Sequence, residues 1–126
     1  NFFHAIATLV FLAQPDPIAA GYRALLRDEL KLRAHGEVDD ASWKAKLALL
    51  EKETGLRRES KLFLEYARHS FLDTLTLYLH GICCDIDVEP GPRQIASRYL
   101  RKRLQYFQSH YAPPEGYAVF PEELKN

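Results

Sequence analysis

The sequence predicts a single all-α domain, a compact bundle of about five helices followed by an irregular C-terminal tail. Two observations lead to this prediction. Apolar residues recur with the period of a helix in every long segment, and no segment alternates apolar and polar residues as a strand does. The chain has 126 residues, of which 47% are apolar and 27% charged, so we expect residues 1–126 to form one domain of ordinary globular composition.

The first segment, residues 2–13, is strongly apolar. It is shorter than the ~20 residues that span a bilayer, and it lacks the basic residues that open a signal peptide. We therefore expect a core helix and no membrane association, with a docking surface for missing upstream sequence as the alternative. Because the chain starts at Asn1 and contains no methionine, we expect it to be excised or processed from a longer protein.

The second helix is predicted to begin at Asp16 and Pro17, a good cap and first-turn pair, and to stop near Gly36. Two charged residues, Glu29 and Arg33, fall inside its apolar stripe. They are four residues apart with the acid first, the order that favours an ion pair within a helix. Both side chains are therefore expected to point toward other helices.

The third helix is predicted to start at a cap formed by Asp39 or Asp40, and it carries an apolar stripe of Trp43, Leu47 and Leu50.

The fourth helix, residues 56–80, is the longest element, and its C-terminal half is apolar on almost every side. We expect it to be the central, most buried helix. Glu65, His69 and Asp73 recur at intervals of four on its polar side. This row predicts a solvent-exposed ladder of charges, and a histidine held between two carboxylates for acid–base chemistry is the alternative.

The fifth helix, residues 94–111, places two polar residues on its apolar side. Arg103 and His110 fall in the middle of its apolar half, two turns apart. A buried charge needs a partner or a purpose, and Glu29 and Arg33 share the same fault, so we expect a shared polar interior. The structural interpretation is a buried ion-pair network with possible carboxylate partners for Arg103. The functional interpretation is a polar cleft or interface that holds a catalytic or binding pair.

The segment from Arg103 to His110, RLQYFQSH, resembles the Arg-x4-6-His motif of the HEPN superfamily at its longest spacing. Members of that family are small all-helical domains, often dimeric, and many are metal-independent ribonucleases of toxin–antitoxin and phage-defence systems. The resemblance implies that His110 acts as acid or base and that Arg103 stabilises phosphate charge.

The outer face of the fifth helix is basic. No carboxylate occurs between residues 90 and 114, although 17 basic and 17 acidic residues cancel over the whole chain. Such a face contacts phosphates or an acidic protein surface, or is simply solvated. Two cations in the first turn of the fourth helix oppose the helix dipole, and either an anionic partner or the nearby Glu53 or Glu59 would relieve that cost. The candidate binding residues are therefore Arg98, Arg101, Lys102, Arg57 and Arg58.

The predicted function is a non-catalytic helical domain that binds a partner protein. It would present either the basic, glutamine-rich face of residues 94–111 or the apolar first helix. Regulatory, immunity and antitoxin-type roles all suit such a module, and RNA binding and homodimerisation stay open. The alternative function is an endoribonuclease of the HEPN type in bacterial defence, with Arg103 and His110 as its catalytic residues.

Cys83 and Cys84 are neighbours, too close for an unstrained disulfide. Two free thiols favour a reducing compartment, so we expect a cytoplasmic protein. The acids at residues 85–89 suggest a metal site together with His80, but zinc usually takes two spaced pairs of ligands and no second pair follows. We expect no metal and no cofactor, since there is no glycine-rich phosphate loop either.

Overall fold

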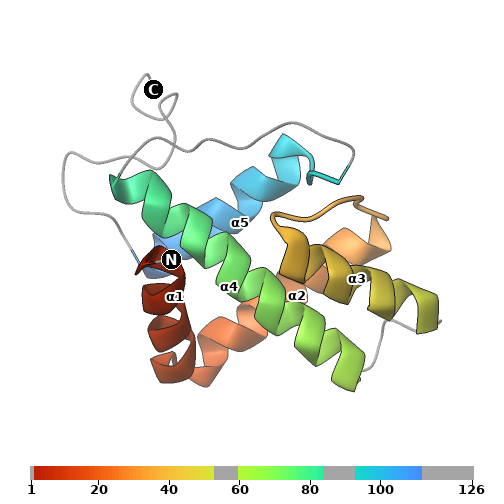
Figure 1. The fold of residues 1–126 in the computed structure, drawn as a ribbon, viewed down its shortest axis with the longest axis horizontal. Coiled ribbons are helices and arrows are strands. Elements are labelled where there is room, and N and C mark those ends of the chain that lie inside the picture. The colour runs from red at the N-terminus through yellow and green to blue at the C-terminus, as the bar shows by residue number, and fades with distance from the viewer. Residues whose placement is uncertain (1, 53–59, 84–92, 112–126) are drawn as a thin grey trace.

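The computed structural model describes residues 2–52, 60–83 and 93–111, and these ranges contain five helices (Figure 1). The helices are α1 (Phe2–Ala13), α2 (Asp16–Lys31), α3 (Asp40–Lys52), α4 (Lys61–Cys83) and α5 (Ser97–His110). Apart from one isolated bridge, the described residues form no β-structure. The predicted all-α bundle is confirmed, while the predicted tail, residues 112–126, lies outside the described residues.

α4 is the central helix, as the sequence predicted. It runs diagonally across Figure 1 and contacts each of the other four helices. Phe71 of α4 packs against Phe107 of α5 and Tyr22 of α2, with ring centroids 5.0 and 5.3 Å apart. All three rings are buried. Burying a side chain of this size contributes about 1.5–3 kcal/mol, so this aromatic group stabilises the packing of α2, α4 and α5.

α1 belongs to the core on one side only. Phe11 packs its ring against Phe71 of α4, and Ala7 is completely buried. Phe2, Leu9 and Leu12 are 71%, 67% and 75% exposed. The expectation of a core helix therefore holds for the inner face. Within the described ranges no single helix has both the length and the apolar character to cross a bilayer. α1 and α2 meet these two criteria only when they are taken together, and they are bent by 111° relative to each other.

α2 ends at Lys31, earlier than the predicted stop near Gly36. The amides of Arg33 and Ala34 donate to carbonyls of the last turn at 3.0 and 2.9 Å, which is a Schellman turn. Arg33 has φ 57. This left-handed conformation usually belongs to glycine, and it costs another residue about 1–2 kcal/mol.

The helix starts differ slightly from the prediction. Asp16 lies inside the first turn of α2, after Pro15 at the cap position, so its side chain does not cap the helix. Asp39 does precede α3, and its carboxylate accepts the amide of Asp40 at 2.8 Å. The acidic start predicted for α3 is therefore present.

Residues 32–39 form a loop that docks onto the chain just before α5. The amide of Glu37 donates to the carbonyl of Arg93 at 2.8 Å, and the amide of Ile95 donates back to Glu37 at 3.3 Å. Gly36 has φ 88, and a Cβ there would lie 2.6 Å from the backbone of Gln94. Only glycine fits this approach. The approach carries the next residue, Glu37, into the interior.

α3 turns a different face inward from the one its apolar stripe suggested. Leu47 and Leu50 are 39% and 50% exposed, and Trp43 is half-buried. The buried residues of α3 are Ser42, Lys46 and Leu49. The stripe predicts the wrong face because the 32–39 loop offers carbonyl oxygens to the ammonium of Lys46, which rotates the helix toward that loop.

Candidate functional site

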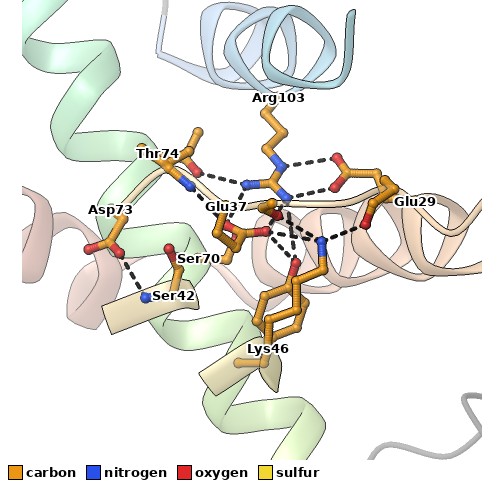
Figure 2. Close-up of polar contacts among 12 residues, drawn as sticks. Glu29, Glu37, Ser42, Lys46, Ser70, Asp73, Thr74 and Arg103 are labelled. Carbon is orange, nitrogen blue, oxygen red and sulfur yellow. Dashed lines mark hydrogen bonds and ion pairs between the residues drawn. The ribbon is translucent and has the colours of Figure 1, made fainter. Parts of the chain in front are cut away.

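Arg103 is fully buried at the centre of the bundle, as its place on the apolar half of α5 predicted. Glu29 accepts from its Nε and Nη2 at 2.9 and 2.6 Å, and Glu37 accepts from its Nη1 and Nη2 at 2.9 and 2.6 Å (Figure 2). Nη1 also donates to Thr74 Oγ1 at 3.4 Å. A guanidinium has five N–H groups. These contacts use all of them.

Lys46 brings a second cation to the same place. Its Nζ donates to the carbonyls of Ala34 and Gly36, both at 2.8 Å, and lies 3.9 Å from Glu37 Oε2. The loop that buries Glu37 therefore also binds Lys46. Two acids and two bases meet here, so their charges cancel. We call these four residues the buried cluster: Glu29, Glu37, Lys46 and Arg103.

The pKa values within the buried cluster follow from burial and mutual attraction. Burial alone would raise the pKa of Glu37, but the charges of Arg103 and Lys46 outweigh it and hold that pKa below its usual value. Burial lowers the pKa of Lys46, and the nearby Glu37 opposes this shift. Arg103 stays charged at any pH that proteins meet. The cluster is therefore an ion network that depends on every member.

Hydroxyl groups surround the buried cluster and complete its hydrogen bonds. Tyr66 Oη donates to Glu37 Oε2 at 2.6 Å. Tyr22 Oη lies 2.8 Å from Ser70 Oγ and donates to Thr74 Oγ1 at 3.0 Å. Burial raises the pKa of Tyr22 to about 12. These groups come from α2 and α4, whereas Lys46 lies on α3 and Arg103 on α5. The network therefore connects all the described helices except α1.

Sequence reasoning missed Glu37, Lys46 and Tyr66. Glu37 lies in a loop, where a helical wheel gives no direction. Lys46 shares its side of α3 with Ser42 and Leu49, and the row of larger apolar residues on the other side was the stronger signal. The pairing of these residues depends on tertiary contacts, so no local pattern could have revealed it.

The predicted ladder on α4 is wrong at Asp73. Glu65 is exposed, but Asp73 is buried and its Oδ2 accepts the backbone amide of Ser42 at 3.0 Å. Asp73 thus satisfies an amide of the first turn of α3 from a neighbouring helix, which is a good position for an acid. Burial raises the pKa of Asp73, although the bonds to Ser42 oppose the shift.

The predicted ion pair between Glu29 and Arg33 is not formed. Arg33 follows the end of α2 in a left-handed conformation and is exposed, whereas the carboxylate of Glu29 binds Arg103. The spacing of four residues pairs side chains only where the helix continues through both. Of these two residues, only Glu29 therefore belongs to the polar interior.

His110 and Arg103 lie in different environments. His110 is exposed in the last turn of α5, and its ring lies against Tyr106 with centroids 4.6 Å apart. The wheel predicts burial wrongly here because it does not show where the surrounding core ends, and Phe107 is the last fully buried residue of α5. Arg103 has no accessible surface and no N–H left for a phosphate. The HEPN-type assignment of these two residues therefore has no geometric support here.

The basic face of α5 borders a groove between α2 and α5. The groove has a volume of about 510 Å³. Lys102 is exposed and lines it, Arg98 is exposed next to Tyr99, with its guanidinium 4.7 Å from that ring, and Arg101 is half-buried. The other two predicted binding residues, Arg57 and Arg58, lie outside the described residues.

The buried cluster forms part of the wall of this groove, because Glu29 lines it with its carboxylate held by Arg103. The Glu29–Arg103 pair also joins α2 to α5. It therefore fixes the separation of the two walls.

In the part of the chain that the structure describes, no group of three or more His, Cys, Asp or Glu side chains is placed to hold a metal ion. Residues 84–89 of the sequence cluster lie outside that part. Comparisons with protein-family models, with curated proteins and with solved structures find no match for this chain. Function must therefore be inferred from the surfaces and cavities of the molecule itself.

Proposed function

We propose that this chain is a helical protein-interaction domain and that the groove between α2 and α5 is its binding surface. The observation that carries the proposal is the character of the two walls. The α2 wall is largely apolar, with Ala24, Leu25 and Leu32, and Leu32 is 66% exposed. The α5 wall contributes two tyrosines, Tyr99 and Tyr106, together with polar groups. Apolar grooves of this kind receive the apolar face of an amphipathic helix.

The positive charge of the α5 wall favours a partner with negative charge. Lys102 and Gln105 line the groove, and α5 contains no carboxylate. Arg103 is neutralised by Glu29 and Glu37 inside the domain and is fully buried, so it does not contribute to the surface. Arg98 and Lys102 have no ion pair with a carboxylate among the described residues. The complementary partner is an amphipathic helix with acidic residues along the edge that faces α5.

Asp28 determines which edge of the partner helix faces α2 and which faces α5. It is exposed on the α2 wall, opposite Lys102. A partner helix with acids on one edge and a base on the other satisfies both walls, whereas the reversed orientation places like charges together.

The test uses a fluorescein-labelled synthetic helix with leucines at every third and fourth position and glutamates beside them. We expect saturable binding by fluorescence anisotropy, weakened by added salt. Lys102→Glu should weaken binding at least tenfold, which is about 1.4 kcal/mol. Lys44→Glu, a matched reversal of an exposed cation on α3, should leave binding unchanged.

Two further variants of the experiment locate the peptide. The same peptide with lysines in place of the glutamates should bind more weakly than the acidic one. Ala24→Gln, an exposed position on the α2 wall, should reduce binding by filling the groove without changing charge. Equal binding of the two peptides, or an acidic peptide that ignores Lys102→Glu, would refute the proposed surface.

The exposed stripe of α1 is a second candidate surface, and the partner that fits it is a second copy of the chain. Phe2, Leu9 and Leu12 lie on one side of α1, which contains no Asp, Glu, Lys or Arg. Two such stripes can meet without like-charge repulsion. We expect concentration-dependent dimers in sedimentation velocity. Leu9→Lys should abolish them, and Leu64→Lys, at an exposed leucine of α4, should not.

A further inference from the structure

A second cavity lies between the end of α2, the 32–39 loop and α3. Its volume is about 450 Å³, within the range of small-molecule sites. Its wall is mainly apolar and includes Leu30, Leu47 and Leu50. The last two are the exposed leucines of the apolar stripe on α3. They form an apolar surface that the described part of the domain leaves open to solvent.

Two of the polar groups that line this pocket are cations. Arg33 and Lys46 line it together with His35, and among the described residues no carboxylate does. Lys46 already donates to two carbonyls and lies beside Glu37, so it offers the pocket mainly its carbon chain. Arg33 is exposed, and its guanidinium makes no contact with a carboxylate of the described residues. Arg33 is therefore the group that can bind an anion here.

The backbone of Arg33 supports the same assignment. It is the one described residue other than glycine with a positive φ. Glycine is the favoured residue at this position of a Schellman turn, and an arginine there is held in a disfavoured conformation. A disfavoured conformation next to a cavity is a pointer to function. Here it keeps a cation at the rim of the pocket.

We propose that this pocket binds a small amphipathic carboxylate, such as an arylalkanoate. The apolar part of the ligand lies against Leu30, Leu47 and the indole of Trp43, and the carboxylate pairs with the Arg33 guanidinium, two N–H groups to two oxygens. His35, whose ring meets Trp43 edge-on with centroids 5.3 Å apart, supports the indole. The binding site is separate from the α2–α5 groove and does not depend on the protein partner.

The protein supplies its own reporter, because Trp43 is the single tryptophan of the chain and lines the pocket. The test titrates the protein with 4-phenylbutyrate and follows tryptophan fluorescence. The neutral 4-phenylbutanol and the cationic 4-phenylbutylamine serve as matched probes. We expect a saturable change with the carboxylate and at least tenfold weaker binding of the other two.

Arg33→Gly separates binding from folding. Because glycine suits the backbone at this position, the variant should unfold at no lower temperature than the unchanged protein while binding 4-phenylbutyrate at least tenfold more weakly. Arg33→Lys should retain part of the affinity. Lys44→Ala, which removes an exposed cation of α3 that does not line the pocket, should bind normally.

Three results would overturn the proposal: no saturable change with any probe, equal binding of the carboxylate and the amine, or unchanged affinity of a folded Arg33→Gly protein.

Discussion

Replacing Arg103 with methionine removes the cation that two buried carboxylates share. In the unchanged protein Glu29 and Glu37 each bind the guanidinium through two hydrogen bonds. Methionine has a similar length and no charge, so the variant leaves both acids buried with Lys46 as the one remaining cation. Breaking a buried ion pair in this way typically costs about 3–5 kcal/mol. That is a large part of the roughly 5–15 kcal/mol by which a domain is stable.

A buried acid can escape this penalty by taking up a proton, and this sets the size and the pH dependence of the effect. Each pH unit above 4.5, the ordinary pKa of a glutamate here, costs about 1.4 kcal/mol for each acid that must stay protonated. At pH 7 one protonated glutamate therefore costs about 3 kcal/mol. The magnitude agrees with the penalty for a broken pair, so we expect Arg103→Met to lose about 3–5 kcal/mol at pH 7.

The sign of the pH dependence should reverse in the variant. In the unchanged protein the pKa of Glu37 is lowered, so its stabilisation is present above 4.5 and is lost as the pH falls through the lowered pKa. Without Arg103 the strongest opposing charge is gone, and we expect burial to outweigh the remaining contributions of Lys46 and Tyr66 and to raise the pKa of Glu37. The stability of Arg103→Met should then fall as the pH rises above 4.5, and acidification toward that pH should restore part of it.

The assay is urea unfolding followed by circular dichroism at several pH values. The double variant Arg103→Met with Glu29→Gln keeps one acid and one base, Glu37 and Lys46, and should recover at least about 2 kcal/mol relative to Arg103→Met. Arg98→Met, at an exposed position of the same helix, should change stability by less than about 0.5 kcal/mol. A loss below about 1 kcal/mol for Arg103→Met at pH 7, or a double variant that is no more stable, would contradict the reasoning.

Three further outcomes are expected from the same unfolding assay. Gly36→Ala should destabilise the domain by several kcal/mol, because its φ is 88 and the new Cβ would lie 2.6 Å from the backbone of Gln94; a loss of less than about 1 kcal/mol would mean that the loop can move aside. Burial raises the pKa of Tyr22 to about 12, so stability should fall between pH 10 and 12 by up to about 3 kcal/mol, and Tyr22→Phe should reduce that slope; an unchanged slope would argue against the burial of this hydroxyl. The raised pKa of Asp73 means that its contribution to stability is present below pH 3.8 and is lost as the pH rises through that raised pKa. Asp73→Asn keeps an acceptor for the amide of Ser42 and should remove this pH dependence. If the free energy of unfolding of the variant varied with acidic pH as it does in the unchanged protein, the expectation would be disproved.

The sequence predicts what depends on local periodicity and fails where the chain makes distant contacts. The central position of α4 and the burial of Arg103 follow from apolar residues repeated every three to four positions. A partner for Arg103 could also be found this way, because Glu29 shares the same anomaly on its own helix. These predictions succeed because each concerns the side of a helix that faces its neighbours.

Glu37 and Lys46 show the limit of that approach. Glu37 enters the interior because the backbone at Gly36 packs against Gln94, a contact between distant parts of the chain. Lys46 then turns α3 toward the carbonyls of the same loop and leaves Leu47 outside. The energy that orients α3 comes from tertiary hydrogen bonds, which the apolar pattern of a single helix does not contain.

A helical wheel also does not show how far burial extends along a helix. Arg103 and His110 occupy the same side of α5, yet one is enclosed and the other exposed. Neighbouring helices decide how far the core reaches, so a pattern that pairs two residues by direction alone can combine a structural group with a surface group.

The central claim is that the Arg103 guanidinium is closed off by Glu29 and Glu37 and shapes the domain from within. Nitrogen-15 NMR of the arginine side chains tests this most directly, with exposed Arg98 as the internal reference. Separate guanidinium proton signals for Arg103 that exchange with water far more slowly than those of Arg98 are the expected result. Rapid exchange of the Arg103 protons, equal to that of Arg98, would show an open guanidinium and would contradict the account.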